Sequence, residues 1–452
     1  MEKIVSEIAR IFINNILEVL STCDNFENFE TAALSEAKLC AAKMIGAYVE
    51  IVDTAIASDK VARRRAGYAV ERRSDKRNMQ TLVGEVTLTR TLYKKAAGGY
   101  EYLADTALGI ESRSRVSSGV SFSLVSAARE MSYGKSAKYV TSGAVSRQTV
   151  MSRVRHGCAM EELVDERRRV SELHIDADED HVTLTEGIKS EVPLISVYEG
   201  IVSKGSRREC KEVFHISEYG KTADSLWEQA LTEIERRYDL TGTDIYLHGD
   251  GAAWVQKGLE WIPNAIFVLD KYHKNKEIKN ITAGLGKGRR KEFNKAIRES
   301  LAHEDLRLFN DIIKSMCKES PNRVDKIRKS AKYLRKFIKG ISICEKDPQA
   351  NNGGCTEPHV SHILSARLSS RPMAWSKITL QHLAPVLAAS NIAVLPKQPI
   401  PKVLPKPLRK ITAKARKEFL KRATGMPHPD AIGTLPINGK VTGTYVLLKQ
   451  FA

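Results

Sequence analysis

Residues 172–185 read ELHIDADEDHVTLT, and this stretch decides the fold. Polar and apolar residues alternate along it, which predicts a β-strand with one buried face. Alternate strand residues share a face, so His174, Asp176 and Asp178 lie together, opposite the apolar residues between them. Two carboxylates on one face repel each other, and a divalent cation, which prefers oxygen ligands, would relieve that repulsion. An exposed edge strand or a solvated acidic turn explains the same pattern without a metal.

Further strands and one helix follow this stretch along the chain. Residues 222–238 have apolar side chains at helical spacing, and the segments around them have strand character. Such an order predicts a mixed α/β sheet. The strand segments are VPLISVYEGIV at 192–202, KEVFHIS at 211–217, DIYLHGDGAAW at 244–254 and AIFVLDKYH at 265–273.

The segment at 244–254 ends in Gly249-Asp250-Gly251. Glycines on both sides let the backbone turn tightly and leave the Asp250 carboxylate accessible at the end of a strand. Ligand sites in α/β sheets lie at the carboxyl ends of strands. Asp250 is therefore a candidate site residue, although aspartate is also common in ordinary turns.

Two more acids follow secondary-structure boundaries. Asp270 ends a strand, with His273 three residues later; the pair suits a metal site, whereas Asp270 as the N-cap of a helix is the structural alternative. Glu357 lies at Thr-Glu-Pro after a glycine-rich loop, where Pro358 suits the first turn of a helix over residues 355–370. A solvated glutamate at a helix start is the simpler explanation of Glu357.

Composition narrows the class of partner. The chain has 452 residues with 42% hydrophobic and 28% charged residues, which indicates folded domains. A net charge of +18 favours a polyanion, either nucleic acid or an anionic membrane. No run of about 18 apolar residues is present, and the N-terminus lacks a secretory signal, so we expect a cytoplasmic protein without a membrane span. Seven scattered cysteines without a CxxC pair argue against disulfides or a zinc knuckle.

Basic side chains concentrate in two places that suit DNA. SYGKSAKYV, TSGAV and SRQTVMSRVRH, over residues 132–156, resemble a helix-turn-helix in which Ser146 caps the second helix. That helix would present Arg147, Gln148 and Arg153 to a DNA groove, although an ordinary helical hairpin fits the pattern as well. Residues 271–340 are helical in pattern and carry 21 basic and 8 acidic side chains, an excess that predicts a phosphate-facing surface.

These features predict six regions. The first is an N-terminal helical region (1–62), and the second is a DNA-binding region (63–160) that contains a β-hairpin near Gly84, a flanking run of arginines and the helix-turn-helix. The first part of an α/β core (170–273), a basic α-helical insertion (274–345) and the last helices of the core (346–395) follow. The last region is a basic Pro/Lys-rich C-terminal tail (396–452).

Four segments together resemble the ISLre-type insertion-sequence transposases, relatives of the Mutator-like DDE transposases with an RNase H-like core. The resemblance covers about residues 60–380. The segments are HIDADEDHV at 174–182, LHGDGAAW at 247–254, VLDKYHKNKEIK at 268–279 and CTEPHVSHILSARLSSRPMAWS at 355–376.

The resemblance implies a site and a reaction. Asp178, Asp250 and Glu357 would be the three acids that bind two Mg²⁺ ions, for which Mn²⁺ can substitute, with Asp176 as the alternative first acid. Asp270 and His273 would match an accessory Cys-x-x-His element, where Asp in place of Cys puts a metal role in doubt. Such a site cleaves and joins DNA by two-metal phosphoryl transfer.

The resemblance also implies the setting of that reaction. The partner would be double-stranded DNA, both element ends and target, bound by a homo-oligomer in the bacterial cytosol or on the nucleoid. The insertion would hold the DNA backbone, with Lys287, Arg289, Arg290 and Lys291 as candidate contacts. The alternatives are a DNA-binding protein derived from a transposase that has lost catalysis, and a nuclease on the same core.

Overall fold

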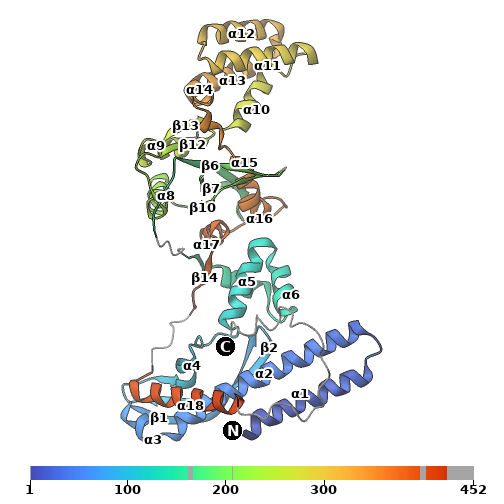
Figure 1. The fold of residues 1–452 in the computed structure, drawn as a ribbon, viewed down its shortest axis with the longest axis vertical. Coiled ribbons are helices and arrows are strands. Elements are labelled where there is room, and N and C mark those ends of the chain that lie inside the picture. The colour runs from blue at the N-terminus through green and yellow to red at the C-terminus, as the bar shows by residue number, and fades with distance from the viewer. Residues whose placement is uncertain (1, 161–165, 206, 398–403, 425–452) are drawn as a thin grey trace. The chain divides into compact units, whose positions relative to one another are not determined.

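The computed structural model describes residues 2–160, 166–205, 207–397 and 404–424 of a mixed α/β protein. The chain divides into two compact units (Figure 1). The first unit comprises Met1–Arg115 with Gln398–Ala452, and the second comprises Val116–Lys397. Among the described residues, no helix is both long and apolar enough to cross a membrane.

The first unit joins helices to a small antiparallel sheet. Its core forms where α2 packs on the sheet, around Val49, Met79, Val86 and Leu88. The elements are α1 (Glu2–Thr22), α2 (Phe26–Ser58), α3 (Lys60–Arg65), β1 (Tyr68–Thr81), β2 (Gly84–Lys95), β3 (Tyr100–Tyr102), α4 (Leu103–Leu108) and α18 (Lys406–Thr424).

The predicted hairpin is present and is longer than expected. β1 and β2 pair from Tyr68↔Lys95 to Thr81↔Gly84, so the strand begins within the basic run that precedes the predicted hairpin. Gly84 has φ +112°, a conformation that favours glycine and closes the two-residue turn. Of the preceding arginines, Arg63 is buried over the Tyr93 ring and does not face solvent.

The C-terminal region differs from the expected tail. Part of it forms α18. Leu404, just before this helix, and Leu408, within it, are buried in one cluster with Val52, Ile56 and Tyr93 of the same unit. The helix was not predicted because the region is rich in Pro and Lys and has few apolar side chains. The helix can form because the prolines at 405 and 407 lie at its start, where proline is tolerated. Residues 398–403 and 425–452, also part of the expected tail, lie outside the described residues.

Three short helices open the second unit. They are α5 (Ser118–Glu130), α6 (Tyr133–Thr141) and α7 (Arg147–Val154). The turn between α6 and α7 passes through left-handed backbone at Ser142 and Gly143, and Ser146 caps α7 by accepting a hydrogen bond from Thr149 N (3.2 Å). The predicted helices and the predicted cap are confirmed.

The three helices belong to the unit that holds the large sheet. Val120 and Val150 share a core with Leu383 of α17 (Lys377–Ala388) and with Leu194 of the sheet. The expected region 63–160 therefore divides at Arg115, with its hairpin in one unit and its helix-turn-helix in the other.

A five-stranded mixed sheet forms the centre of this unit, in the order β10-β7-β6-β12-β13. β7 runs antiparallel to both β6 and β10, whereas β12 and β13 run parallel to β6. The strands are β6 (Glu172–Thr183), β7 (Lys189–Tyr198), β10 (Phe214–Ile216), β12 (Asp244–Gly249) and β13 (Ile266–Leu269). The four predicted strand segments and the strand at 172–185 all contribute to this sheet.

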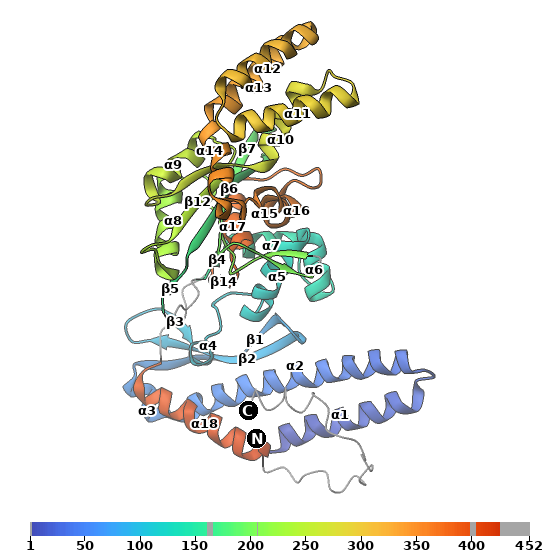
Figure 2. The same ribbon diagram turned by 45° about the horizontal axis from the view of Figure 1, so that its top comes forward.

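The two faces of β6 differ as the alternation predicts. Leu173, Ile175 and Ala177 pack against α8 (Ala223–Arg237) and α9 (Ala253–Trp261), which lie together along one side of the sheet (Figure 2). The opposite face carries His174 and Asp176, both buried. Thr222 caps α8 through Ser225 N (3.2 Å), which fixes where the predicted helix begins.

A helical insertion separates β13 from the last helices of the unit. Its own core includes Ile297, Phe309, Ile327 and Leu334. It contains α10 (Lys271–Thr282), α11 (Lys287–Ala302), α12 (Leu306–Glu319), α13 (Val324–Lys336) and α14 (Ile338–Lys346), so the predicted helical character is confirmed.

The remaining elements are short. A continuous helical stretch follows the glycine-rich loop, formed by α15 (Thr356–His359), a π-helical turn (Val360–Ser365) and α16 (Ala366–Leu368). The small strands are β4 (Gly157–Ala159) paired with β14 (Ile392–Val394), β5 (Arg168–Arg169) with β11 (Tyr238–Asp239), and β8 (Ile201–Lys204) with β9 (Arg207–Cys210); single 3₁₀ turns cover Pro321–Arg323 and Pro348–Asn351.

The packing of α18 predicts that the C-terminal region stabilises the first unit. Leu408→Ala removes a fully buried side chain and should lower the free energy of unfolding by about 2–5 kcal/mol in urea titrations. Lys410→Ala, an exposed position of the same helix, is the control and should leave it unchanged. Equal stability of both variants and the wild type would contradict the packing.

Candidate functional site

The parallel pairing of β6 with β12 brings two predicted acids together. Ala177 pairs with Gly249, the last residue of β12, so the next residues along the two strands, Asp178 and Asp250, are neighbours. Both carboxylates are half-buried at the carboxyl end of β12. Asp178, rather than Asp176, is therefore the acid of β6 that lies beside Asp250.

Charge is concentrated at this edge of the sheet. Burial, together with the nearby carboxylates of Glu179 and Asp250, raises the pKa of Asp178 to about 7, against the opposing effect of the hydrogen bond from Glu179 N. No Lys or Arg side chain forms a salt bridge with Asp178 or Asp250 among the described residues. The repulsion at Asp178 thus comes from Glu179 and Asp250, and not from Asp176 as the alternation along the strand suggested.

The Gly-Asp-Gly turn is fixed by close packing on both sides. A Cβ at Gly249 would lie 2.6 Å from the Val255 side chain, and one at Gly251, where φ is +81°, would lie 2.2 Å from the Phe337 ring. The hydroxyl of Tyr333 donates a hydrogen bond to the Asp250 carbonyl. Asp250 is therefore held between its own helix α9 and helix α13 of the insertion, and both glycines are required sterically.

Asp270 is the N-cap of a helix, which was the structural alternative to a metal-binding role. It caps α10, since its carboxylate accepts hydrogen bonds from Tyr272 N (2.8 Å) and His273 N (3.2 Å). His273 Nδ1 lies 3.4 Å from the same carboxylate. The hydrogen bond to Asp270 raises the pKa of His273, helped by the charges of Asp178 and Asp250 and opposed by burial. Burial alone would raise the pKa of Asp270, but its contacts with His273 keep it low.

Asp176 is buried and fully engaged. Its carboxylate accepts hydrogen bonds from the Tyr198 hydroxyl (3.0 Å) and from Cys355 N (2.9 Å), and it lies 3.2 Å from His359 Nδ1. The other ring nitrogen of His359 lies 3.5 Å from Cys210 Sγ. Asp176 thus fastens the start of α15 to the sheet, which is a positioning role and leaves its oxygens little capacity for a metal.

Glu357 lies between two anchored neighbours. Thr356 precedes it and lies close enough to Asp270 to lower the pKa of that carboxyl, and His359 follows it and contacts Asp176. The turn that carries Glu357 therefore contacts Asp270, directly after β13, and Asp176, within β6, and these two strands lie on either side of β12. The Glu357 side chain itself is exposed.

The acids fit a divalent cation only in part. Asp178 and Asp250 offer paired oxygens with unresolved repulsion, the chemistry that Mg²⁺ prefers. Among the described residues, however, no three His, Cys, Asp or Glu side chains are gathered so as to hold a metal ion. The structure therefore brings Asp178 and Asp250 together, with Asp270 and His273 beside them, and leaves the Glu357 carboxylate outside that group.

Two residues at this edge were not predicted. Glu179 accepts a hydrogen bond from Trp254 Nε1 (2.8 Å), and its pKa is raised by burial and by Asp250, so it adds a further acid to the cluster. Burial and the charge of Asp250 raise the pKa of Tyr333. Glu179 was visible in the DADED run, whereas nothing in the sequence placed Tyr333, which comes from the insertion, beside Asp250.

The predicted DNA contacts differ in exposure. Arg147 and Gln148 are exposed at the start of α7, but Arg153 is 3% exposed and lies on the buried face of the helix, so it does not belong to that surface. Lys287, Arg289, Arg290 and Lys291 are all exposed on α11. Arg289 pairs with Glu319, and Arg290 donates to the Leu285 carbonyl (2.9 Å). Basic side chains of α11 also line an open depression of about 410 Å³.

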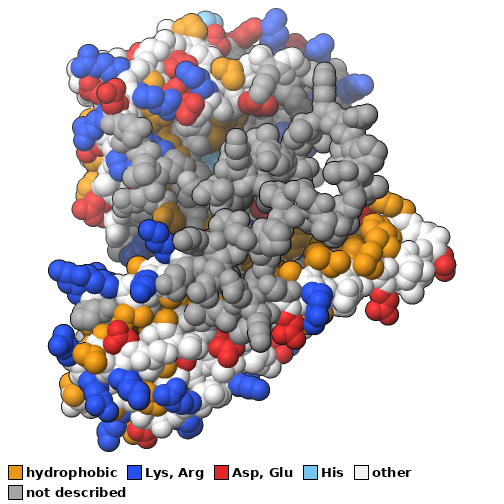
Figure 3. All heavy atoms as spheres, turned by 60° about the horizontal axis from the view of Figure 1, so that its bottom comes forward, with side chains coloured by type: hydrophobic (Ala, Val, Ile, Leu, Met, Phe, Trp, Pro, Cys, Tyr) orange, Lys and Arg blue, Asp and Glu red, His pale blue; other side chains and the backbone are white. Residues whose placement is uncertain are grey.

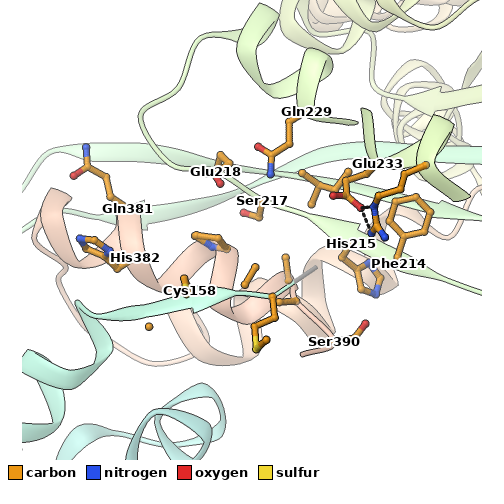
Figure 4. Close-up of a pocket in the computed structure, with 18 of the residues that line it drawn as sticks. Cys158, Phe214, His215, Ser217, Glu218, Gln229, Glu233, Gln381, His382 and Ser390 are labelled. Carbon is orange, nitrogen blue, oxygen red and sulfur yellow. Dashed lines mark hydrogen bonds and ion pairs between the residues drawn. The ribbon is translucent and has the colours of Figure 1, made fainter. Parts of the chain in front are cut away.

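A separate pocket of about 390 Å³ lies away from the acids (Figure 4). His215 and Glu218 line it from the region of β10, Gln229 from α8, and Gln381 and His382 from α17. Burial lowers the pKa of His215 to about 3, so its ring is neutral. None of the predicted site residues lines this pocket.

Comparison with known proteins assigns the family. The model of the uncharacterised protein family UPF0236 matches residues 20–396. The chain belongs to UPF0236. A UPF0236 protein of Caldanaerobacter subterraneus subsp. tengcongensis is 36% identical over 345 residues, covering 75% of this chain and 72% of that protein. A second from the same organism is 34% identical over 392 residues, covering 85% and 82%. A UPF0236 protein in the vanSb 3' region of Streptococcus gallolyticus is 23% identical over 403 residues, covering 84% and 86%.

The different surroundings of Asp176 and Asp178 predict opposite effects on stability. Asp176→Asn weakens a buried acceptor of several hydrogen bonds and should lower the free energy of unfolding by about 1–3 kcal/mol. Asp178→Asn, an isosteric change two residues away, removes a desolvated charge and should leave the metal-free protein as stable as the wild type or more so. Thermal unfolding in EDTA measures both, and a larger loss for Asp178→Asn would contradict this assignment.

Proposed function

We propose that this UPF0236 protein is a DDE transposase that cleaves and joins DNA at the edge formed by Asp178 and Asp250. The observation that carries the proposal is the adjacency of these two acids at the point where the parallel pairing of β6 with β12 ends. Hard carboxylate oxygens, mutual repulsion and a neighbouring basic insertion suit a metal-dependent phosphoryl transfer.

The sheet supports an RNase H-like core as part of the proposal. Three antiparallel strands are followed by two strands parallel to the first, in the order β10-β7-β6-β12-β13. The first acid lies on the central strand β6 and the second directly follows its parallel neighbour β12. This is the arrangement expected of the core that the ISLre-type and Mutator-like resemblance implies.

Three acids of the chain would bind the metal ions. Asp178 and Asp250 would hold a divalent cation, and Glu357 would be the third acid of the set. A pair of Mg²⁺ ions would supply activation of the attacking oxygen and neutralisation of the leaving one. In the reaction, a water or a DNA 3′-hydroxyl forms the new P–O bond, and the opposite P–O bond breaks, with its oxygen leaving as the 3′-hydroxyl of the cut strand.

The DNA would meet two exposed basic surfaces of the second unit. Arg147 and Gln148, exposed at the start of α7, would read bases in a groove. The basic face of α11, with Lys287 and Lys291, would contact the phosphate backbone. Pairing two element ends would require a homo-oligomer, and bacterial DNA as substrate would place the reaction in the cytosol.

The names of the relatives add an independent argument. The name of the first Caldanaerobacter relative joins eleven locus labels, and that of the second joins four. We interpret these names as repeated copies of one gene in one genome, which is what a mobile element leaves behind. Nothing comparable is expected of an ordinary single-copy nuclease.

Catalysis is tested by Asp250→Asn with a duplex carrying the DNA that flanks the gene. Cleavage and joining in Mg²⁺ should fall by a factor of about 10³ or more, equivalent to about 4 kcal/mol, while DNA binding persists. Asp244→Asn, at the exposed start of the same strand, is the control and should retain activity. Undiminished activity of Asp250→Asn would refute the proposed site, a wild type that binds but never cuts would indicate a DNA-binding protein, and cleavage without joining would indicate a nuclease.

Backbone contact is tested by Lys287→Ala/Lys291→Ala. Loss of two phosphate contacts should weaken binding to all sequences alike and reduce the slope of log affinity against log salt by about 2. Lys314→Ala is the control, since Lys314 is equally basic and exposed in the insertion but pairs with Asp311 (3.1 Å) on α12. An unchanged salt slope in the double variant would remove α11 from the DNA surface.

A further inference from the structure

Two of the seven free cysteines lie against each other in the second unit. Cys210 is the last residue of β9, and Cys355 directly precedes α15, so the two are far apart along the chain. The Cys210 thiol donates a hydrogen bond to the Cys355 sulfur. Both side chains are half-buried. Neither belongs to a CxxC pair, so the sequence gave no sign that they meet.

His359 lies against both cysteines. It follows Cys355 by four residues, and its backbone N–H donates to the Cys355 carbonyl (3.0 Å), so the two side chains share one face of a helical turn. Its ring nitrogen Nε2 lies 3.5 Å from Cys210 Sγ. Its other ring nitrogen lies 3.2 Å from the Asp176 carboxylate, which also accepts a hydrogen bond from Cys355 N (2.9 Å). The same Asp176–His359 pair therefore positions both sulfurs.

A pair of sulfurs in contact has a reaction open to it that a single thiol lacks. A cysteine that only fills space is usually buried and inert. A small oxidant can reach a half-buried sulfur, and a second sulfur in contact then converts the first oxidation product into a disulfide. The geometry around His359 therefore fits thiol oxidation better than packing alone.

We propose that Cys210 and Cys355 form a modification site, which hydrogen peroxide converts into a reversible disulfide. The Cys355 sulfur attacks one peroxide oxygen, the O–O bond breaks, and a sulfenic acid forms with release of water. The Cys210 sulfur then bonds to the Cys355 sulfur, the S–O bond breaks, and its hydroxide leaves as water with the Cys210 thiol proton. The two thiols lose two electrons, which the peroxide gains, and a dithiol reverses the oxidation.

The disulfide would regulate the site of the proposed function. The sulfurs of a disulfide are about 2.05 Å apart, closer than thiols in hydrogen-bonding contact, so bond formation draws β9 and the start of α15 together. Cys355 lies two residues before Glu357, the third acid of the proposed set. Oxidation should therefore shift the segment that carries Glu357 and slow DNA cleavage. This consequence, unlike the disulfide itself, rests on the proposed function.

Thiol counting on the full chain tests the modification site. After brief peroxide treatment and denaturation, the thiols that react with N-ethylmaleimide should fall from seven to five, and dithiothreitol should restore them. This reagent suits the count because at neutral pH it spares the Lys side chains, which Figure 3 shows with Arg on the surface. Peptide mapping should find Cys210 linked to Cys355.

Two variants make the count specific. Cys210→Ser should form no link at Cys355, because the second sulfur is missing. Cys158→Ser is the matched control, since Cys158 is also half-buried but its thiol contacts the Ala393 carbonyl (3.8 Å), and this variant should still link Cys210 to Cys355.

Cleavage of the flanking DNA in Mg²⁺ tests the regulation. The oxidised wild type should cut at least about tenfold more slowly than the reduced wild type, because a small displacement of a site residue has an effect of this size. Dithiothreitol should remove the difference, and Cys210→Ser should show none.

Each remaining outcome has one meaning. A wild type that keeps all its thiols after peroxide, or links other cysteines, would overturn the modification site. A fully linked wild type with undiminished cleavage would overturn its regulation of the acids. A reduced wild type that never cuts would contradict the proposed function instead, and the linked peptide would still establish the modification site.

Discussion

The parallel pairing of β6 with β12 is the constraint on which the rest of the site depends. Its register sets Ala177 against Gly249, and so the following acids, Asp178 and Asp250, are placed side by side. A shift of one residue would turn Asp178 to the apolar face that packs on α8 and α9. Burial of Leu173, Ile175 and Ala177 on that face, with no exposed surface on any of them, therefore fixes the acids as well as the core.

The structure shows which neighbours stabilise this arrangement and which oppose it. Phe337 and Tyr333 of the insertion pack against the Gly-Asp-Gly turn and donate a hydrogen bond to it, respectively. Asp176 accepts a hydrogen bond from Cys355 N at the start of α15. Burial and adjacent carboxylates oppose the ionised form of Asp178. The fold keeps two mutually repelling acids next to each other although this arrangement lowers its stability. Functional sites commonly have this property.

Local patterns in the sequence predicted the strands of the sheet and the turn at Asp250, because each depends on residues adjacent in the chain, whereas Asp178 was chosen over Asp176 from the family resemblance. The alternation of polar and apolar residues predicted the two faces of β6, and the glycines on both sides of Asp250 predicted an accessible turn there. Contacts between distant segments could not be predicted: the sequence does not show that Tyr333 reaches Asp250, that α7 packs on α17, or that Arg153 is buried. The helix α18 was not predicted, because Pro and Lys dominate the composition of this region and its apolar residues are few. Glu357 was predicted from resemblance, and the structure places its turn, but not its carboxylate, at the site.

The central claim is that Asp178 and Asp250 together bind a divalent cation. Anomalous diffraction from crystals of the wild-type chain soaked in Mn²⁺ tests it most directly, because manganese scatters anomalously and substitutes for magnesium at oxygen sites. The account predicts a manganese peak within about 2.0–2.3 Å of carboxylate oxygens from both Asp178 and Asp250, and no such peak in crystals of Asp250→Asn. A saturating soak with no peak between these two acids, or with manganese bound only elsewhere, would contradict it.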